Sequence, residues 1–364
     1  MKPSILGVGS ASALGCGVGS LRAGLEGTAQ PRIDNVEVAT RSGVQVLPVY
    51  VANAEGLERF VPRRALRRLD EFTRMALLAS FLALEDSGVS LEDTSRIGVV
   101  LGTAYGPMET TFRYQDTIID DGDKGASPTL FANSVHNAPA SSVSIFMKIE
   151  GPCLTLTNFE LTTTEVLRTA CAWLEQGTVD FVLAGVGDEY CSVLGYALGK
   201  LGAGGSERID PFHVDQCSYL PAAGFVTLLL GGESVDGAYA RIDKIVCERA
   251  AARLSDDVIR GHRALVLSAN GDRSTGPAYQ RARLGGAKIA AYAPLYGSLP
   301  VGLGFDVALA GVSCRAGRVY PLTGVETAAS FPPLTQELPL QHGDRIGCLE
   351  CSPHHATLVS LERL

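Results

Sequence analysis

Short apolar segments recur along this chain, and glycine and small polar residues interrupt or end most of them. Runs of about 4–8 apolar residues with such boundaries are typical of strands that are covered on both faces of a sheet. In the first part of the chain they span residues 4–12, 97–101, 153–156 and 181–185. In the second part they span residues 224–230, 242–246, 264–268, 345–349 and 356–361, with further strand material around Ile289.

Apolar residues at helical spacing separate many of these strands. In the segment 63–88, Phe72, Leu77 and Leu84 belong to one such stripe, and Gly88 is placed to end the helix. The same pattern predicts helices over residues 18–25, 108–119, 133–149, 161–175, 278–284 and 304–314. Because strands and helices alternate in two successive rounds, we predict an α/β fold with a largely parallel sheet and two related halves.

Composition and charge narrow the class of protein. Hydrophobic residues make up 46% of the 364 residues and charged residues 19%, which excludes low-complexity disorder. Lys and Arg number 31 against 39 Asp and Glu, a formal net charge of -8. An acidic chain without a basic run is a poor ligand for nucleic acids, so we expect no nucleic-acid partner.

The N-terminus and the cysteines bear on the compartment. The chain carries no charge between Lys2 and Arg22, but glycines and serines interrupt this stretch. It never sustains the roughly 7–15-residue apolar core of an export signal, and no run of roughly 18 apolar residues predicts a membrane span. The nine cysteines are scattered, often within apolar segments. We therefore expect buried free thiols, a reducing cytoplasm and no membrane partner.

The segment GPCLTLTNFELTTTEVL predicts a strand that ends in a sharp turn and opens a helix. The turn would present Glu160 at a helix N-terminus, where nucleophiles are held and anions are favoured. This segment resembles the β-ketoacyl-acyl-carrier-protein synthases of the thiolase superfamily, as do IGVVLGT, SPTLFANSVHNAPASSVSI, DPF at Asp210 and the closing HATLVSL. The resemblance implies a thiolase-like fold in a layered α-β-α-β-α arrangement. Its N-terminal half would span residues 1–235, with the nucleophile turn, and its shortened C-terminal half residues 236–364.

The catalytic positions that the resemblance implies hold other residues in this chain. Glu160 stands where the family has its acyl-accepting Cys, Asn270 where it has the first His, and Ser298 where it has the second. A condensing enzyme needs a thiolate to hold the acyl chain and two imidazoles to steady the developing enolate. We therefore expect this chain to have no catalytic residues, no cofactor, and no condensing activity of its own.

The resemblance then points to the chain length factors, the inactive ketosynthase homologues of this family. They pair with an active ketosynthase and shape its tunnel for a polyketide or polyene, and acyl carrier protein is a transient partner. Glu160 departs from the Gln that is frequent at their nucleophile turn. Two alternatives stay open. One is a stand-alone module that binds acyl chains or carrier protein, and the other is a thiolase-fold enzyme that uses Glu160 and His136 as an acid/base pair.

Two sets of residues would serve the chain length factor. Met108, Thr111, Phe112 and Gln115 fall at i, i+3, i+4 and i+7 of a predicted helix, so they share one face. The resemblance places this helix at the dimer interface and the end of the tunnel, although the pattern alone also fits an ordinary core stripe. The apolar, small-residue segment SVHNAPASSVSIFMKI, with Ser134, His136 and Asn137, is expected at the interface with the ketosynthase.

Two further clusters of residues fit either a functional site or ordinary structure. Cys348, Cys351, His354 and His355 have a spacing loosely like that of a zinc site. The odd spacing of the two cysteines would point them to opposite faces of a strand, so we expect no metal. Four arginines begin the segment 63–88 and would either be a solvated helix start or dock an acidic carrier protein. They are Arg63, Arg64, Arg67 and Arg68.

Overall fold

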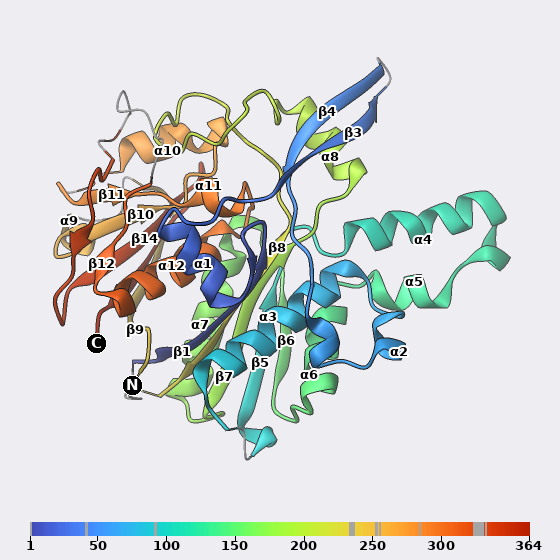
Figure 1. Ribbon diagram of the computed structural model, residues 1–364, viewed down its shortest axis with the longest axis horizontal. Helices are drawn as coiled ribbons and strands as arrows, with labels where there is room; N and C mark the ends of the chain where they lie inside the picture. The colour runs from blue at the N-terminus through green and yellow to red at the C-terminus, as the bar shows by residue number, and fades with distance from the viewer. Residues whose placement is uncertain are drawn as a thin grey trace.

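The structure is a computed structural model that describes residues 2–40, 43–90, 93–232, 237–251, 254, 256–282, 284, 286–322, 331 and 333–364. A large mixed sheet runs through the molecule, and helices cover its faces (Figure 1). Among the described strands, ten follow one another in this sheet, and the short β2 (Gly15–Cys16) pairs with β1 beside them. The ten strands fall into two sets of five, which are the predicted related halves.

The two sets of strands have the same order and the same directions. The first set is β1 (Ser4–Ser12), β5 (Ile97–Gly102), β6 (Cys153–Leu156), β7 (Phe181–Asp188) and β8 (Gly224–Gly231). The second set is β9 (Ala240–Glu248), β10 (Ala264–Leu267), β11 (Lys288–Ala290), β14 (Arg345–Cys351) and β15 (Ala356–Glu362). The orders in space are β6-β5-β7-β8-β1 and β11-β10-β14-β15-β9, so each strand has a counterpart at the same place in the other half.

Strand directions correct the prediction of a largely parallel sheet. In each half the first three strands of the spatial order are parallel: β6, β5 and β7 in one half and β11, β10 and β14 in the other. The two pairings that follow in each order are antiparallel. Four residues join β14 to β15, and so short a connection permits only an antiparallel pair. A two-residue antiparallel pairing between β1 and β9, with Ile5 opposite Ala240, joins the halves.

Two helices lie between the half-sheets and form the middle layer. They are α7 (Thr162–Glu175) and α12 (Gly302–Ala316), and they occupy equivalent places in the two halves. In α12 every residue from Gly302 to Cys314 is buried, as expected of a helix that is covered all round. The hydroxyl of Thr164 on α7 donates a hydrogen bond to Thr357 on β15, at 3.2 Å. The middle layer therefore contacts both halves.

The outer layers complete the arrangement. Alternate residues of β5, such as Val99 and Leu101, pack with α3 (Glu71–Ser87) and α6 (Ala138–Met147), whereas Val100 faces the cluster that includes α7. In the second half, Leu265 and Leu267 pack with the short helices α9 (Asp256–Ile259) and α10 (Gly276–Arg281), on the face opposite α12. The layers run α-β-α-β-α, which confirms the predicted fold class.

Local sequence signals shorten two of the predicted helices. The predicted helix over residues 63–88 is divided into α2 (Arg63–Leu66) and α3, because Asp70 caps α3 by accepting a hydrogen bond from the Thr73 amide at 2.8 Å. The predicted helix over residues 133–149 begins only at α6, whose first turn contains a proline. The residues before it form α5 (Pro128–Asn133) and a short loop.

Several elements were not predicted. They include the hairpin of β3 (Ile33–Thr40) and β4 (Gly43–Tyr50) and the helix α8 (Ser192–Lys200). The short elements α11 (Ala293–Tyr296), β12 (Arg318–Val319) and β13 (Leu338–Pro339) are also new, whereas α1 (Gly17–Leu25) and α4 (Met108–Asp121) lie where helices were predicted. Figure 1 shows α4 and α5 extending away from the body of the molecule.

Three predictions concern the chain as a whole. The boundary between residues 235 and 236 lies outside the described residues and stays a prediction. No helix in the described ranges combines the length and the apolar character needed to cross a membrane. The nine cysteines are free, as expected, but Cys153 is exposed and Cys16 and Cys247 are only half-buried. Cys153 is exposed because β6 is the last strand of the sheet, with one edge unpaired among the described strands.

Candidate functional site

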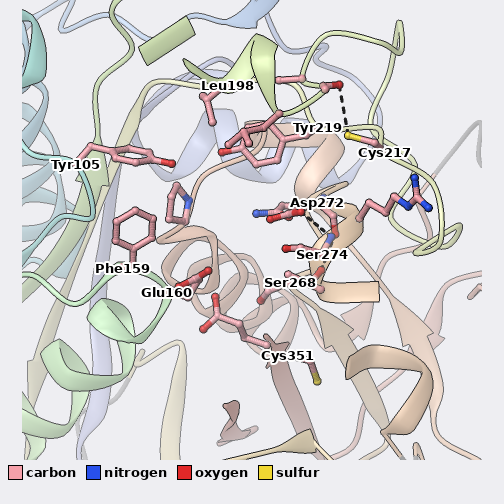
Figure 2. A pocket seen from close by; sticks show the side chains of 18 residues that line it. Tyr105, Phe159, Glu160, Leu198, Cys217, Tyr219, Ser268, Asp272, Ser274 and Cys351 are labelled. Carbon is pink, nitrogen blue, oxygen red and sulfur yellow. Dashed lines mark hydrogen bonds between the residues drawn. The ribbon is translucent and has the colours of Figure 1, made fainter. Parts of the chain in front are cut away.

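A cavity of about 670 Å³ lies where the two halves meet (Figure 2). The first half contributes Tyr105 after β5 and Glu160 after β6, and the second contributes Ser268 after β10 and Glu350 near the end of β14. The carboxyl ends of parallel strands therefore converge on it, which is where ligands bind in many α/β folds. Leu198 in the last turn of α8 and residues of the segment that follows, such as Leu201 and Tyr219, close a third side.

The turn that carries Glu160 has the predicted form. β6 ends at Leu156, and after a short 3₁₀ turn α7 begins at Thr162. The Asn158 amide donates to the Thr162 hydroxyl at 2.8 Å, and Phe159 has a φ of 49°. A side chain other than glycine rarely adopts this left-handed conformation, so the turn is sharp and locally strained. Glu160 is half-buried and makes no hydrogen bond or ion pair with any described residue.

A buried aspartate fixes the loop after β5 that carries Tyr105. Asp188, at the end of β7, accepts hydrogen bonds from the Thr103 hydroxyl at 2.6 Å and from the Tyr105 amide at 2.8 Å. Burial nevertheless raises the pKa of Asp188 to about 6. The loop that it fixes brings the Tyr105 ring edge-on to the Phe159 ring, with centroids 5.3 Å apart. Figure 2 shows both rings on the same side of the cavity, next to Glu160.

Asn270 and Ser298, the other two catalytic positions that the resemblance implies, differ in whether they reach the cavity. Asn270 lines the cavity with Glu160. Ser298 does not line it, and it is almost fully buried. Its hydroxyl donates to the Asn270 carbonyl and accepts from the Leu220 amide at 3.0 Å, so Ser298 ties together the loops behind the cavity. The structure therefore brings two of the three predicted positions into one site.

Two further carboxyl groups lie at the inner side of the cavity. The Glu350 side chain is only 7% exposed, and its Oε2 atom is 3.9 Å from Nε2 of His355. Burial, with a smaller contribution from the nearby Glu160, raises the pKa of Glu350 to about 7. Asp306 on α12 accepts hydrogen bonds from Ser268, which lines the cavity, and from the Tyr296 hydroxyl at 3.0 Å. Burial also raises the pKa of Asp306 to about 7.

The charge of the cavity is predominantly negative. Among the described residues that line it, the carboxyl groups of Glu160, Asp272 and Glu350 accompany the guanidinium of Arg273. Such a lining disfavours an anionic ligand and favours a neutral one. The malonyl unit that a condensing enzyme decarboxylates is anionic, so this lining opposes its binding.

The predicted tunnel residues lie elsewhere. Met108, Thr111 and Phe112 on α4 are half-buried and Gln115 is exposed, and none of them lines the cavity. Only Thr110 of α4 is fully buried, because the helix extends away from the body of the molecule. A tunnel lined by these four side chains would have to lie against α4, outside the cavity of this chain.

The predicted interface residues also lie outside the cavity. Ser134, His136 and Asn137 form the connection between α5 and α6, and His136 and Asn137 are exposed. The His136 imidazole packs against Gly106, where a Cβ would lie 2.6 Å from two ring atoms. Since His136 does not line the cavity, the structure does not bring it together there with Glu160 as an acid/base pair.

The spacing of the cysteines near the C-terminus has the consequence foreseen. Cys348 packs in the central cluster and Cys351 in the outer one, on opposite faces of β14. Within the described ranges, no group of three or more His, Cys, Asp and Glu side chains is placed to hold a metal ion. His355 instead faces Glu350.

Sequence reasoning missed Glu350, Asp272 and the aromatic residues of the cavity. A signal for Glu350 was present, since a charged residue within the apolar segment IGCLEC is unusual in a buried strand. No comparable signal marks Tyr105 or Tyr219, because aromatic residues near strand ends are common in any core.

Comparisons with known proteins agree with this architecture. A family profile described as the β-ketoacyl synthase N-terminal domain matches residues 30–234. The 3-oxoacyl-(acyl-carrier-protein) synthase 2 of Vibrio harveyi is 23% identical over 334 residues, 89% of this chain and 76% of that protein. The same-named synthase of Vibrio cholerae is 26% identical over 209 residues, 55% of this chain and 50% of that protein, so the match spans half of its length.

Solved structures extend the similarity to the whole chain. The ishigamide ketosynthase/chain length factor has a TM-score of 0.82 at 15% identity, and a type II polyketide synthase acyl-carrier protein in complex with its ketosynthase has 0.81 at 14%. A β-ketoacyl synthase from Burkholderia phymatum has 0.78 at 17%. Each match covers 100% of this chain and 99% of the other. At these identities the likeness concerns the fold alone.

Proposed function

The chain belongs to the β-ketoacyl synthase family, and we propose that within it the chain acts as a chain length factor. In this role it carries out no condensation itself. It pairs with an active ketosynthase in the cytoplasm and shapes the tunnel in which a polyketide or polyene chain grows. Acyl carrier protein is then a transient partner of the pair.

The observation that carries this proposal is the content of the cavity at the nucleophile turn. Glu160 and Asn270 occupy it where a thiol and an imidazole would be needed, and Ser298 is buried behind it. A carboxylate could hold an acyl chain only as a reactive anhydride, and neither Asn nor Ser replaces an imidazole in steadying an enolate.

Two cysteines that also line the cavity do not restore this chemistry. Burial and the nearby Glu350 raise the pKa of the Cys351 thiol, so the reactive thiolate is disfavoured. Cys217 lies on the third side of the cavity, where its thiol donates to the Gly202 carbonyl at 3.5 Å. Cys217 does not stand at the turn before α7, and no histidine is among the described residues that line the cavity with it and could activate its thiol.

The unpartnered surface supports a protein partner. β6 is an edge strand with Leu154 exposed, and edge strands commonly pair with another chain. Further large apolar side chains are exposed on α6, which packs against β6, and on the preceding α5, namely Ile145 at 72% and Phe131 at 56%. Large exposed apolar patches of this kind mark protein–protein interfaces. Figure 1 shows α4, α5 and α6 gathered on one side of the molecule.

The proposed tunnel contact follows from α4. Because Met108, Thr111, Phe112 and Gln115 do not line the cavity of this chain, we assign them to the wall of the partner's tunnel. Figure 1 shows α4 extending from the body of the molecule together with α5, where a neighbouring subunit would meet it. We also assign carrier-protein docking to the exposed arginines of the 63–68 segment, since Arg64 and Arg68 border an apolar groove of about 730 Å³.

Co-expression with a ketosynthase tests the pairing. The chain should co-purify with the ketosynthase as a 1:1 complex, and Ile145→Asp should disrupt the complex by placing a charge in the interface. Val44→Asp is the matched control, because Val44 is also exposed, at 65%, but lies on the β3–β4 hairpin. A soluble, monodisperse monomer that does not bind the co-expressed ketosynthase would count against the proposal. A stable homodimer that retains lipid would favour the stand-alone binding module, for which the cavity within a single chain is the supporting observation.

A further inference from the structure

A buried carboxyl group and a buried imidazole face each other at the inner side of the cavity, at a distance too long for a hydrogen bond. Glu350 Oε2 and His355 Nε2 are 3.9 Å apart, and their side chains are 7% and 9% exposed. Neither atom has a hydrogen-bond partner among the described residues. Buried polar atoms are nearly always paired, so Glu350, which also lines the cavity, is a carboxyl group whose hydrogen-bonding capacity the described residues leave unused.

The hydrogen bonds of Ser352 fix the imidazole. The Ser352 oxygen accepts from the amides of His354 and His355 at 3.3 and 3.2 Å, which uses its two lone pairs. Its own proton is therefore donated to Nδ1 of His355, at 2.7 Å. In the neutral ring the remaining proton is then on Nε2, directed at Glu350, where it stabilises the charged carboxylate.

The rest of the cavity fits a chain with carbonyl groups. Tyr105 and Phe159 offer apolar faces, and Asn270 brings a side-chain amide into the same space. An amide and a carboxyl group that line one cavity can stabilise an enolate oxygen and remove the neighbouring proton, respectively. The predominantly negative lining selects against anionic ligands and leaves neutral acyl chains as the better match.

We propose that Glu350, positioned by His355, acts as both general base and general acid on a β-ketoacyl thioester bound in the cavity. It removes and returns a proton of the carbon that lies between the two carbonyl groups. The substrate class rests on the proposed function, since such chains are what a ketosynthase produces. Glu350 takes the proton from the carbon, and the C–H electron pair forms the carbon–carbon double bond of the enolate as the carbonyl electron pair moves to oxygen. Glu350 then returns a proton, so the step needs no other reactant.

The position of Glu350 suits this exchange near neutral pH. Burial raises its pKa to about 7, which is the range in which one carboxyl group can both accept and donate a proton. The groups that bear on it are His355, Glu160 at the start of α7 and Asp306 on α12, together with Tyr279 on α10 and Cys351 on β14. The neighbouring His355 lowers the pKa of Glu350, so removing that imidazole should raise it.

The experiment measures deuterium exchange of acetoacetyl-N-acetylcysteamine in D2O by NMR, with the purified chain alone and with a protein-free reference. The chain should accelerate exchange saturably, and the saturated rate should rise with pH to a plateau with a midpoint near 7. Glu350→Gln should reduce the acceleration at least about a hundredfold. His355→Asn should move the midpoint upward, a change that a merely structural role would not produce.

Matched controls are available within the chain. His354→Asn changes the exposed neighbour of His355, and Glu109→Gln changes an exposed carboxylate on α4, so both should leave the exchange unchanged. Wild-type exchange that follows the protein-free rate, or that rises only with hydroxide, would overturn the proposal even if a variant fails to fold. So would a folded Glu350→Gln variant that exchanges like the wild type. Product formation by the reconstituted ketosynthase pair in either case would show that the chain length factor role stands apart from this inference.

Discussion

Thr164 and Thr357 join the two halves of the molecule through their hydroxyl groups, at 3.2 Å. Thr164 is on the helix that follows the nucleophile turn, and Thr357 is on a strand of the opposite half; both side chains are buried. The position of Glu160 relative to Glu350 therefore depends on a contact behind the cavity as well as on the residues that line it.

Removing this contact should weaken the fold measurably. Thr164→Ala deletes one hydroxyl and leaves that of Thr357 without its partner, which should lower the free energy of unfolding by about 1–3 kcal/mol. Urea denaturation followed by circular dichroism measures the change. Thr129→Ala, at an exposed position of α5, is the control and should stay within about 0.5 kcal/mol of the wild type. Equal midpoints for the two variants would show that the contact contributes nothing.

Restoring a thiol at the turn should not restore condensation. We expect Glu160→Cys to form no β-ketoacyl product, because Asn270 and Ser298 still stand in place of imidazoles and the neighbouring Glu350 disfavours a thiolate. Mass spectrometry of the protein and of the products after incubation with acyl and malonyl carrier proteins tests this. Covalent acylation of the new thiol followed by product formation would contradict it.

Bulk on α4 should set the length of the product of the reconstituted pair. Thr111→Trp should shorten the chain, and Phe112→Ala should lengthen it by one or a few extension units, since added or removed volume shifts the end of a close-packed tunnel. Synthesis itself should continue, because the ketosynthase partner performs the chemistry.

The exposed Glu109 provides the control for the tunnel. Glu109→Ala should leave the product masses unchanged, as its side chain points away from that face. If the pair remains active and neither Thr111→Trp nor Phe112→Ala moves the length distribution, these side chains are ordinary packing residues of α4.

The buried carboxyl groups should make the protein more stable in mild acid than in mild base. Burial raises the pKa of Asp188 to about 6, of Asp306 to about 7 and of Glu189 to about 8. The folded state therefore binds protons more tightly than the unfolded chain, and stability falls as the pH rises from about 4 through 8. We expect the Tm to be higher at pH 5.5 than at pH 8.

One substitution isolates the part that belongs to Asp306. Asp306→Asn keeps the size and an acceptor for Ser268 and Tyr296 but cannot ionise. It should raise the free energy of unfolding at pH 8 by about 1–3 kcal/mol and change it little at pH 5. Asp120→Asn, on the exposed side of α4, should have no such pH-dependent effect. A Tm of Asp306→Asn that shifts equally at both pH values would refute the assignment.

The sequence allowed much of the fold to be predicted because buried strands leave a strong local signal. The runs that became β1, β5 and β15 are apolar on both faces, and the structure places them within a residue or two of the predicted bounds. Strand direction has no such local signal, which is why the antiparallel pairs were missed. The β3–β4 hairpin was missed because its strands are largely exposed and mix polar with apolar residues.

The candidate site was predictable only where one turn carries it. Glu160 follows from a strand, a turn and a helix that are adjacent in the chain. Glu350 and His355 come together with Glu160 through the packing of elements from opposite halves, nearly 200 residues apart. The spacing near the C-terminus suggests only metal chemistry for His355. Glu350, which it faces, lies in a segment whose apolar pattern predicts only a buried strand.

The repeated strand order has an evolutionary consequence. The two halves share one topology and form an internal repeat. The helices α7 and α12 are the two copies of the same element. Each copy begins beside the cavity, where Glu160 precedes one and Pro300 the other. The two walls can diverge independently, because a substitution in one copy does not recur in the other. An ancestral reaction centre can thus be lost from one wall while new acid–base groups arise on the facing one, without any change of architecture.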